Sequence, residues 1–125
     1  MPGWTLLFVL LASGALADVR HSAIPVSLHG TWASSAQHCS NTEAAIVLAK
    51  NSYRGPKGRC SVPWVIESAG AHGTIYPAHL RCPVDNGDEL SATLLLMPKG
   101  ADQLSVGDDF DGVKTYERCP ASGAR

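Results

Sequence analysis

The sequence has few charged and few aromatic residues. Charged residues make up 17% of its 125 positions and aromatic residues 6%, while 45% are hydrophobic and the formal net charge is -1. This balance excludes an intrinsically disordered chain, which would have fewer apolar residues and a larger net charge. It also lacks the excess of positive charge with which nucleic-acid-binding proteins attract phosphates. The composition therefore indicates one small folded domain that does not bind nucleic acid.

Common catalytic and ligand-binding motifs are also missing. The chain contains no G-x-S-x-G, S-x-x-K or H-E-x-x-H sequence, no glycine-rich phosphate loop and no N-x-[ST] glycosylation site. Its five histidines show no compact metal-binding spacing, and His72 and His79 are best explained as a turn residue and an outward-facing strand residue. We expect no catalytic residue, metal or cofactor, and no enzymatic activity. An enzyme would instead need a cleft that gathers histidines and carboxylates from distant segments.

The first apolar segment is predicted to be a secretory signal peptide, residues 1–17. Residues 4–12 form an uncharged apolar run, followed by Ala15-Leu16-Ala17 as an A-x-A cleavage site. No Lys or Arg precedes the run, and a buried N-terminal strand or helix is the alternative. No later apolar stretch approaches the roughly 18 residues of a membrane span. We therefore expect a periplasmic or secreted protein without a membrane anchor.

The cysteines also favour an oxidising compartment. Cys39, Cys60, Cys82 and Cys119 are even in number, so two disulfides are expected. The alternative is a zinc site, but the chain has no C-x-x-C and its cysteines are widely spaced.

Short apolar segments separated by turn residues predict an all-β fold, a small antiparallel up-and-down meander. Asn86-Gly87 is the sharpest turn signal, because both residues tolerate positive φ. Residues 41–50 could form a short helix capped by Thr42, but Ile46-Val47-Leu48 suits a strand, which we expect. The expected strands are 25–33, 44–50, 60–67, 74–82, 89–97, 103–106 and 113–119.

Residues 60–82 predict a specific hairpin register. If the chain folds about Ala71-His72, one face is apolar throughout, and a slip of one residue would destroy this agreement. The opposed pairs are Cys60 with Cys82, Val62 with Leu80, Trp64 with Ala78 and Ile66 with Tyr76. This register predicts the Cys60–Cys82 disulfide.

The second disulfide, Cys39–Cys119, follows by elimination. Counting strand directions places both cysteines at the same end of the meander. A bond between them would tie the first strand to the last, which suggests a closed barrel without exposed edges. We expect one barrel-like domain over residues 18–125, with an N-terminal arm at 18–24 and a flexible tail at 120–125.

Two charge clusters are candidate sites. The basic cluster surrounds Tyr53 and is either a contact patch for an anionic partner or glycan, or a solvated hairpin loop. Its members are Lys50, Arg54, Lys57 and Arg59. The acidic cluster of Asp108, Asp109 and Asp111 lacks the spacing and the distant Glu of a calcium loop, so a turn between strands is the better explanation.

Gly30-Thr31-Trp32 resembles the first-strand motif of lipocalins and of the bacterial metalloprotease-inhibitor barrels related to them in shape. A Trp at this place can plug one end of a small barrel. The chain also resembles, over most of its length after residue 17, small exported proteobacterial β proteins of uncharacterised function. These resemblances imply a lipocalin-like barrel and export. The inhibitor family has a single disulfide, so its inhibitory residues are not carried over. The residues that carry the second resemblance are His29 to Trp32, Cys39, Tyr53, Gly55, Cys60, Val62, Arg81-Cys82, Gly107, Asp109-Phe110, Tyr116 and Arg118-Cys119.

Together these observations predict an exported, monomeric, non-enzymatic binding module whose partner is a protein or small ligand in the extracytoplasmic space. One form of this hypothesis is a hydrolase inhibitor, in which residues 18–25 or the loop of residues 50–59 enter the target's cleft. The alternative is a carrier of a small apolar ligand inside the barrel. A barrel of this size is usually filled by side chains, so Trp32, Trp64, Tyr76 and residues 94–97 are expected in the core.

Overall fold

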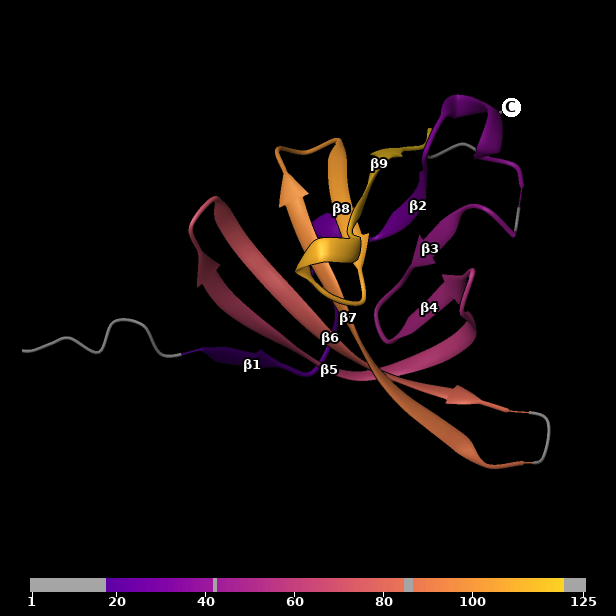
Figure 1. Cartoon of the computed structure of the whole chain (residues 1–125), viewed down its shortest axis with the longest axis vertical. Coiled ribbons are helices and arrows are strands. Elements are labelled where there is room, and N and C mark those ends of the chain that lie inside the picture. The colour runs from indigo at the N-terminus through magenta and orange to yellow at the C-terminus, as the bar shows by residue number, and fades with distance from the viewer. Residues whose placement is uncertain (1–17, 42, 85–86, 121–125) are drawn as a thin grey trace, which may run out of the picture.

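The computed structural model describes residues 18–41, 43–84 and 87–120. Within these ranges the chain is all-β, with nine strands and three short 3-10 helices (Figure 1). The strands are β1 (Val19–His21), β2 (Gly30–Ala33), β3 (Ile46–Leu48), β4 (Ser52–Gly55), β5 (Gly58–Gly70), β6 (Gly73–Pro83), β7 (Glu89–Lys99), β8 (Gln103–Gly107) and β9 (Lys114–Arg118). The 3-10 helices are η2 (Val26–Leu28), η3 (Ala36–His38) and η4 (Phe110–Gly112).

Strands β2 to β9 form a closed antiparallel barrel. Each of these strands pairs with the next one in sequence, and β9 pairs back to β2. Strand β1 lies outside this ring and pairs with the second half of β5, whose first half pairs with β4. The predicted all-β meander that closes into a barrel is therefore confirmed.

Several predicted features fall outside the described residues. They are the signal peptide at 1–17, Thr42 as a helix cap, Asn86 of the Asn86-Gly87 turn, and residues 121–125 of the tail.

The structure contains two strands that the sequence analysis did not predict, β1 and β4. Strand β4 lies within the segment expected to be a basic loop. It has a single large apolar residue, Tyr53, and one such residue does not make the alternating apolar and polar pattern from which a strand is predicted. Residues 26–28, expected to be part of the first strand, form η2 instead. The strand interpretation of residues 41–50 holds only for Ile46–Leu48.

The predicted hairpin of β5 and β6 is correct at one end and wrong at the other. Ser61 lies opposite Arg81 as expected, but a bulge between Ser61 and Trp64 shifts the register by one residue. Val65, rather than Trp64, therefore lies opposite Ala78 and points into the barrel. Pro63, which has no N–H to donate to a ladder, lies within the bulge. The predicted inward positions of Trp64 and Ile66 are consequently wrong.

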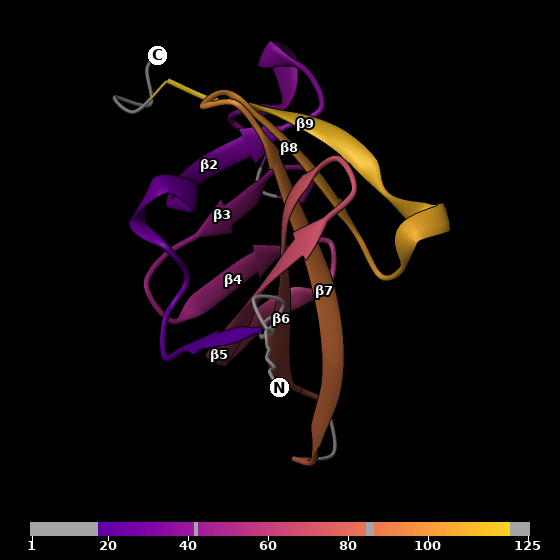
Figure 2. The same ribbon diagram turned by 90° about the vertical axis from the view of Figure 1, so that its left-hand side faces the viewer.

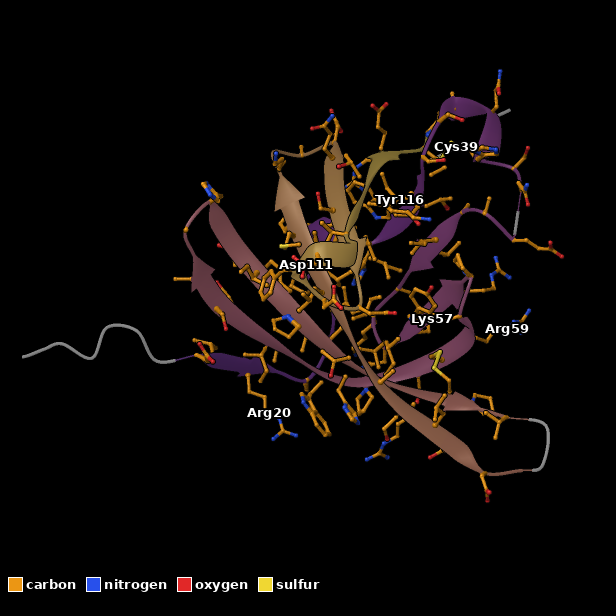
Figure 3. All side chains as sticks on the ribbon, in the orientation of Figure 1. Arg20, Cys39, Lys57, Arg59, Asp111 and Tyr116 are labelled. Atoms are coloured by element: carbon orange, nitrogen blue, oxygen red, sulfur yellow. A yellow bond between two sulfur atoms is a disulfide. The ribbon has the colours of Figure 1, made fainter. Side chains whose placement is uncertain are left out.

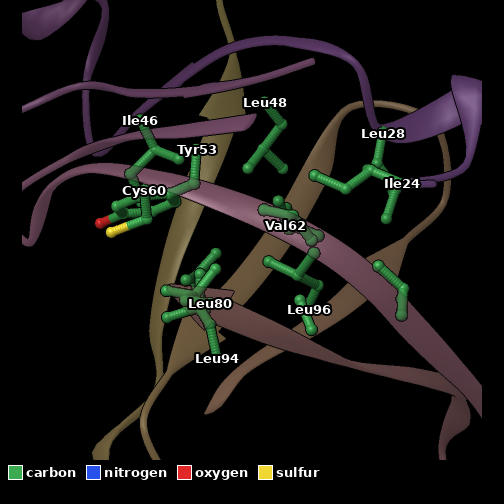
Figure 4. Packing of buried hydrophobic residues seen from close by; sticks show 14 of the residues in the cluster. Ile24, Leu28, Ile46, Leu48, Tyr53, Cys60, Val62, Leu80, Leu94 and Leu96 are labelled. Carbon is green, nitrogen blue, oxygen red and sulfur yellow. The ribbon is translucent and has the colours of Figure 1, made fainter. Parts of the chain in front are cut away.

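Side chains fill the barrel interior. The largest fully buried side chains of the described residues belong to the inward faces of the ring strands or to η2, and Figure 4 shows part of this cluster. Trp32, as expected from its place in the first barrel strand, is one of them. Its indole N–H donates to the Leu28 carbonyl at 3.0 Å.

Arg118 covers the exposed side of this packing. Its guanidinium lies 4.3 Å from the centre of the Trp32 ring. The same group donates to the carbonyls of His29 (2.9 Å), Ser27 (2.7 Å) and Ala101 (3.0 Å). Because these carbonyls belong to η2, to the residue that follows it and to the β7–β8 turn, one side chain joins β9 to two separate segments. The tryptophan and the arginine together close this part of the barrel.

Both predicted disulfides are present, Cys39–Cys119 and Cys60–Cys82. The reasoning for the first was wrong, because the additional strand β4 reverses the direction of every later strand. Strand β9 runs antiparallel to β2, so the two cysteines follow opposite ends of neighbouring strands. The β2–β3 connection folds back along the outer face of the barrel and brings Cys39 to Cys119. Ala33, Ala45 and Cys119 are buried together there, beside Cys39.

All three tyrosines should titrate at unusually high pH. Burial is the largest cause that raises the pKa of Tyr53, Tyr76 and Tyr116 above 10.0, and Glu67 adds to the effect at Tyr76. The neutral phenols stabilise the folded state below pH 10.0, and this contribution is lost as pH rises through the raised pKa values. We expect phenolate absorbance near 295 nm to appear at a higher pH in the folded protein than in the urea-unfolded chain. A titration that superimposes on that of the unfolded chain would contradict this expectation.

Candidate functional site

The structure separates the predicted basic cluster into parts. Tyr53 points into the barrel and is 3% exposed, with its hydroxyl accepting from the backbone N–H of Lys57 at 3.4 Å. Arg54 and Arg59 lie opposite each other on β4 and β5 and are exposed on the outer face (Figure 3). Lys50 is exposed in the β3–β4 turn. The surface patch thus contains the basic side chains without the tyrosine.

The basic and acidic clusters, distant in sequence, meet in the fold. The Lys57 ammonium lies 2.7 Å from a carboxylate oxygen of Asp108. The Asp109 carboxylate caps η4 by accepting from the backbone N–H groups of Asp111 (3.0 Å) and Gly112 (2.8 Å). These contacts brace the β8–β9 connection. Among the described residues, no group of three or more His, Cys, Asp or Glu side chains is arranged to hold a metal ion.

The N-terminal arm is held against the barrel rather than projecting from it. Arg20, labelled in Figure 3, lies over the outward face of Trp64 at 4.1 Å. Trp64 in turn stacks on His79 with ring centres 4.2 Å apart. His21 lies 2.7 Å from Glu67. Strand β1 is therefore fixed to β5 by backbone and side-chain contacts, and residues 19–21 are engaged with the sheet.

An apolar groove of about 270 Å³ lies on the outer face of β6, β7 and β8. Ile75, Met97 and Ser105 form its floor, since each lies beside an inward-facing residue of its own strand. The remaining lining comes from the β5–β6 turn, the end of β7 and the β8–β9 connection. These residues are Ala71, His72, Gly73, Thr74, Pro98, Lys99, Phe110 and Val113.

The β8–β9 connection forms one wall of this groove because Gly107 allows a close approach. A Cβ atom on Gly107 would lie 2.7 Å from the Val113 Cα and 2.8 Å from the Gly112 carbonyl oxygen. The connection therefore folds back against β8 and carries Phe110 to the groove, where its side chain remains 63% exposed. The result is a large aromatic side chain presented to solvent beside an apolar depression.

We did not predict this groove from the sequence, although a signal for it is present. Leu94 to Met97 is an uninterrupted apolar run, and in a strand such a run has apolar side chains on both faces. Leu94 and Leu96 fill the barrel, whereas Leu95, 7% exposed, and Met97 lie on the outer face. An apolar outer face implies a second covering layer, which here is the β8–β9 connection.

The structure also bears on the compartment. Two disulfides indicate folding in an oxidising environment. In the described part of the chain, no helix is long and apolar enough to cross a membrane. The chain matches no protein-family model, no curated protein and no solved structure.

Proposed function

We propose that this protein is a periplasmic or secreted binding module without enzymatic activity, and that it contacts a partner protein through the outer groove and Phe110. The observation that supports this proposal is the exposed Phe110 side chain beside a groove lined largely by apolar residues. Exposed aromatic side chains next to apolar depressions are typical of protein-binding sites.

The location of the groove favours the outer surface over the interior as the binding site. The inward-facing side chains pack into one buried cluster that includes Trp32, Leu80 and Leu96. A carrier of an apolar ligand would have to displace these side chains, at the cost of their packing. The outer groove needs no such rearrangement.

Charge at the rim indicates what the partner presents. Lys99 contributes a positive charge to the rim beside the β7–β8 turn, and His72 borders the groove beside the β5–β6 turn as a hydrogen-bonding side chain. A partner segment that inserts an apolar side chain and carries a carboxylate beside it would complement this rim. The braced turn that holds Phe110 also suits the hydrolase-inhibitor form of the proposal, in which this turn occupies the target's cleft.

A peptide-display selection tests the proposed surface. Random 12-residue peptides selected on the wild-type protein should be enriched in an apolar residue near an acidic one. Phe110→Ala should weaken the selected peptides roughly 10- to 30-fold, as expected for an interface anchor. Val26→Ala is the matched control, because Val26 is 81% exposed and is not among the groove-lining residues.

The same variants separate the two forms of the proposal. A secreted protease or lysozyme inhibited by the wild type and Val26→Ala, and less by Phe110→Ala, would support the inhibitor form. Selected peptides that bind both variants equally would show that the groove is not the binding surface.

A further inference from the structure

We propose that the free edge of β7, residues Glu89–Leu94, pairs with the same strand of a second copy to form a symmetric antiparallel dimer. This surface is separate from the groove, so the proposal stands independently of the proposed function. The sequence alone led us to expect a monomer, because the open edge becomes visible only in the folded barrel.

The edge is open because β7 is longer than its neighbour β8. Strand β6 pairs with β7 from Glu89 to Leu96, whereas β8 pairs only with Leu95–Lys99. Among the described residues, no backbone hydrogen bond outside the strand ladders involves residues 89–94. The β6–β7 ribbon accordingly projects beyond the rest of the barrel (Figures 1 and 2).

The free edge lacks the features that usually prevent strand-to-strand association. Open edges in natural proteins are typically short, charged, bulged or interrupted by proline. Strand β1, which lies outside the ring and pairs only with β5, is three residues long and carries Arg20 and His21. In contrast, residues 89–94 have Glu89 as their only charged side chain and contain no proline.

The β6–β7 ribbon has exposed apolar side chains that this pairing would partly bury. Leu90 is 60% exposed and Val84 is 39% exposed. Leu90 lies opposite Cys82, on the face that continues into the barrel core. A second strand alongside β7 would cover part of Leu90 and satisfy the unpaired backbone groups at the same time.

Geometry restricts the register of the dimer. From Leu95 onward the edge is occupied by β8, so the second copy has access only to residues before it. Directly opposed residues of antiparallel strands share a face, so a two-fold axis between Ser91 and Ala92 would place apolar residues opposite polar ones. An axis centred on a residue avoids this, and Ser91 is the residue that confines the pairing to residues 89–93, clear of the β8 pairing that begins at Leu95. This axis places Ser91 of the two copies opposite each other, Leu90 opposite Ala92, and Glu89 opposite Thr93.

A charge-reversal experiment tests both the surface and the register. Sedimentation velocity on the full chain with both disulfides formed should show a weak dimer, with a dissociation constant on the order of 0.1 mM, because the interface lies at the small end of the size range. Ser91→Lys and Ser91→Glu should each raise this constant about tenfold or more, because like charges then oppose each other. An equimolar mixture of the two variants should restore association. Ser52→Lys, an exposed serine on β4, which has a neighbour on each side, is the control and should behave as the wild type.

Each outcome bears on the proposal. A wild-type protein that remains monomeric at about 1 mM, well above the expected constant, would overturn it. A dimer that persists unchanged in both Ser91 variants would also overturn it, because association would then use another surface. Circular dichroism spectra that match the wild type would establish that the variants are folded.

Discussion

Removal of the Cys39–Cys119 disulfide is expected to destabilise the protein by about 4.5 kcal/mol, the loop-closure entropy of a cross-link that spans 80 residues. A domain of this size has roughly 5–15 kcal/mol of net stability. The double variant Cys39→Ala/Cys119→Ala should therefore lose between about a third and nine-tenths of the net stability. Urea titration of the variant and the wild type, followed by circular dichroism, measures the difference.

The second disulfide provides the matched control. Cys60–Cys82 spans only 22 residues and links strands that a tight turn already joins, so its removal should cost about 3.4 kcal/mol. The order of the two effects is the critical result. If Cys60→Ala/Cys82→Ala proved more destabilising than Cys39→Ala/Cys119→Ala, the chain-entropy explanation would fail.

Replacement of Trp32 by Ala should cost about 3–5 kcal/mol, the range for a large buried aromatic residue. Three contributions are lost together: the packing of the ring, its hydrogen bond to the Leu28 carbonyl, and the surface on which Arg118 lies. Trp32→Phe, which keeps part of the ring packing, should have a smaller effect. Thermal and urea unfolding of the variants measure these costs.

Trp64 is the control for this prediction. Its indole lies on the outer face between Arg20 and His79 rather than in the core. Trp64→Ala should therefore cost about 1 kcal/mol, the order of a cation–π contact and a ring stack at a partly exposed site. Equal destabilisation by Trp32→Ala and Trp64→Ala would contradict the placement of the two rings.

The contrast between these tryptophans shows where sequence reasoning succeeded and where it stopped. Strand alternation and turn residues were sufficient to predict the meander and the Cys60–Cys82 disulfide, whereas Cys39–Cys119 and the closure of the barrel were predicted correctly from a strand count that missed β4. Alternation assumes an unbroken ladder, however, and the bulge at Pro63 turns Trp64 outward. The proline was visible in the sequence, but whether it occupies an edge position or a bulge depends on the neighbouring strands.

The candidate site was harder to predict than the fold. The basic cluster was identified from residues close in sequence, and the alternation within β4 sends Tyr53 inward and Arg54 outward. The groove gathers residues from the β5–β6 turn, β7 and the β8–β9 connection, which are separate in sequence. Its assembly depends on the close approach at Gly107, and a glycine in a sequence does not reveal which backbone it will meet.

Closure of the ring through β2 and β9 also determines how the chain must fold. Every other neighbouring pair in the ring is made of consecutive strands, so those pairings can form as local hairpins. Only the pairing of Trp32 with Arg118 and of Ala33 with Glu117 requires the two ends of the domain to find each other. Within the ring, the entropic cost of long-range pairing is therefore concentrated in this step. If Cys39 and Cys119 were oxidised before folding, their disulfide would hold β2 and β9 close together. The order of oxidation and folding should therefore affect the folding rate as well as the stability.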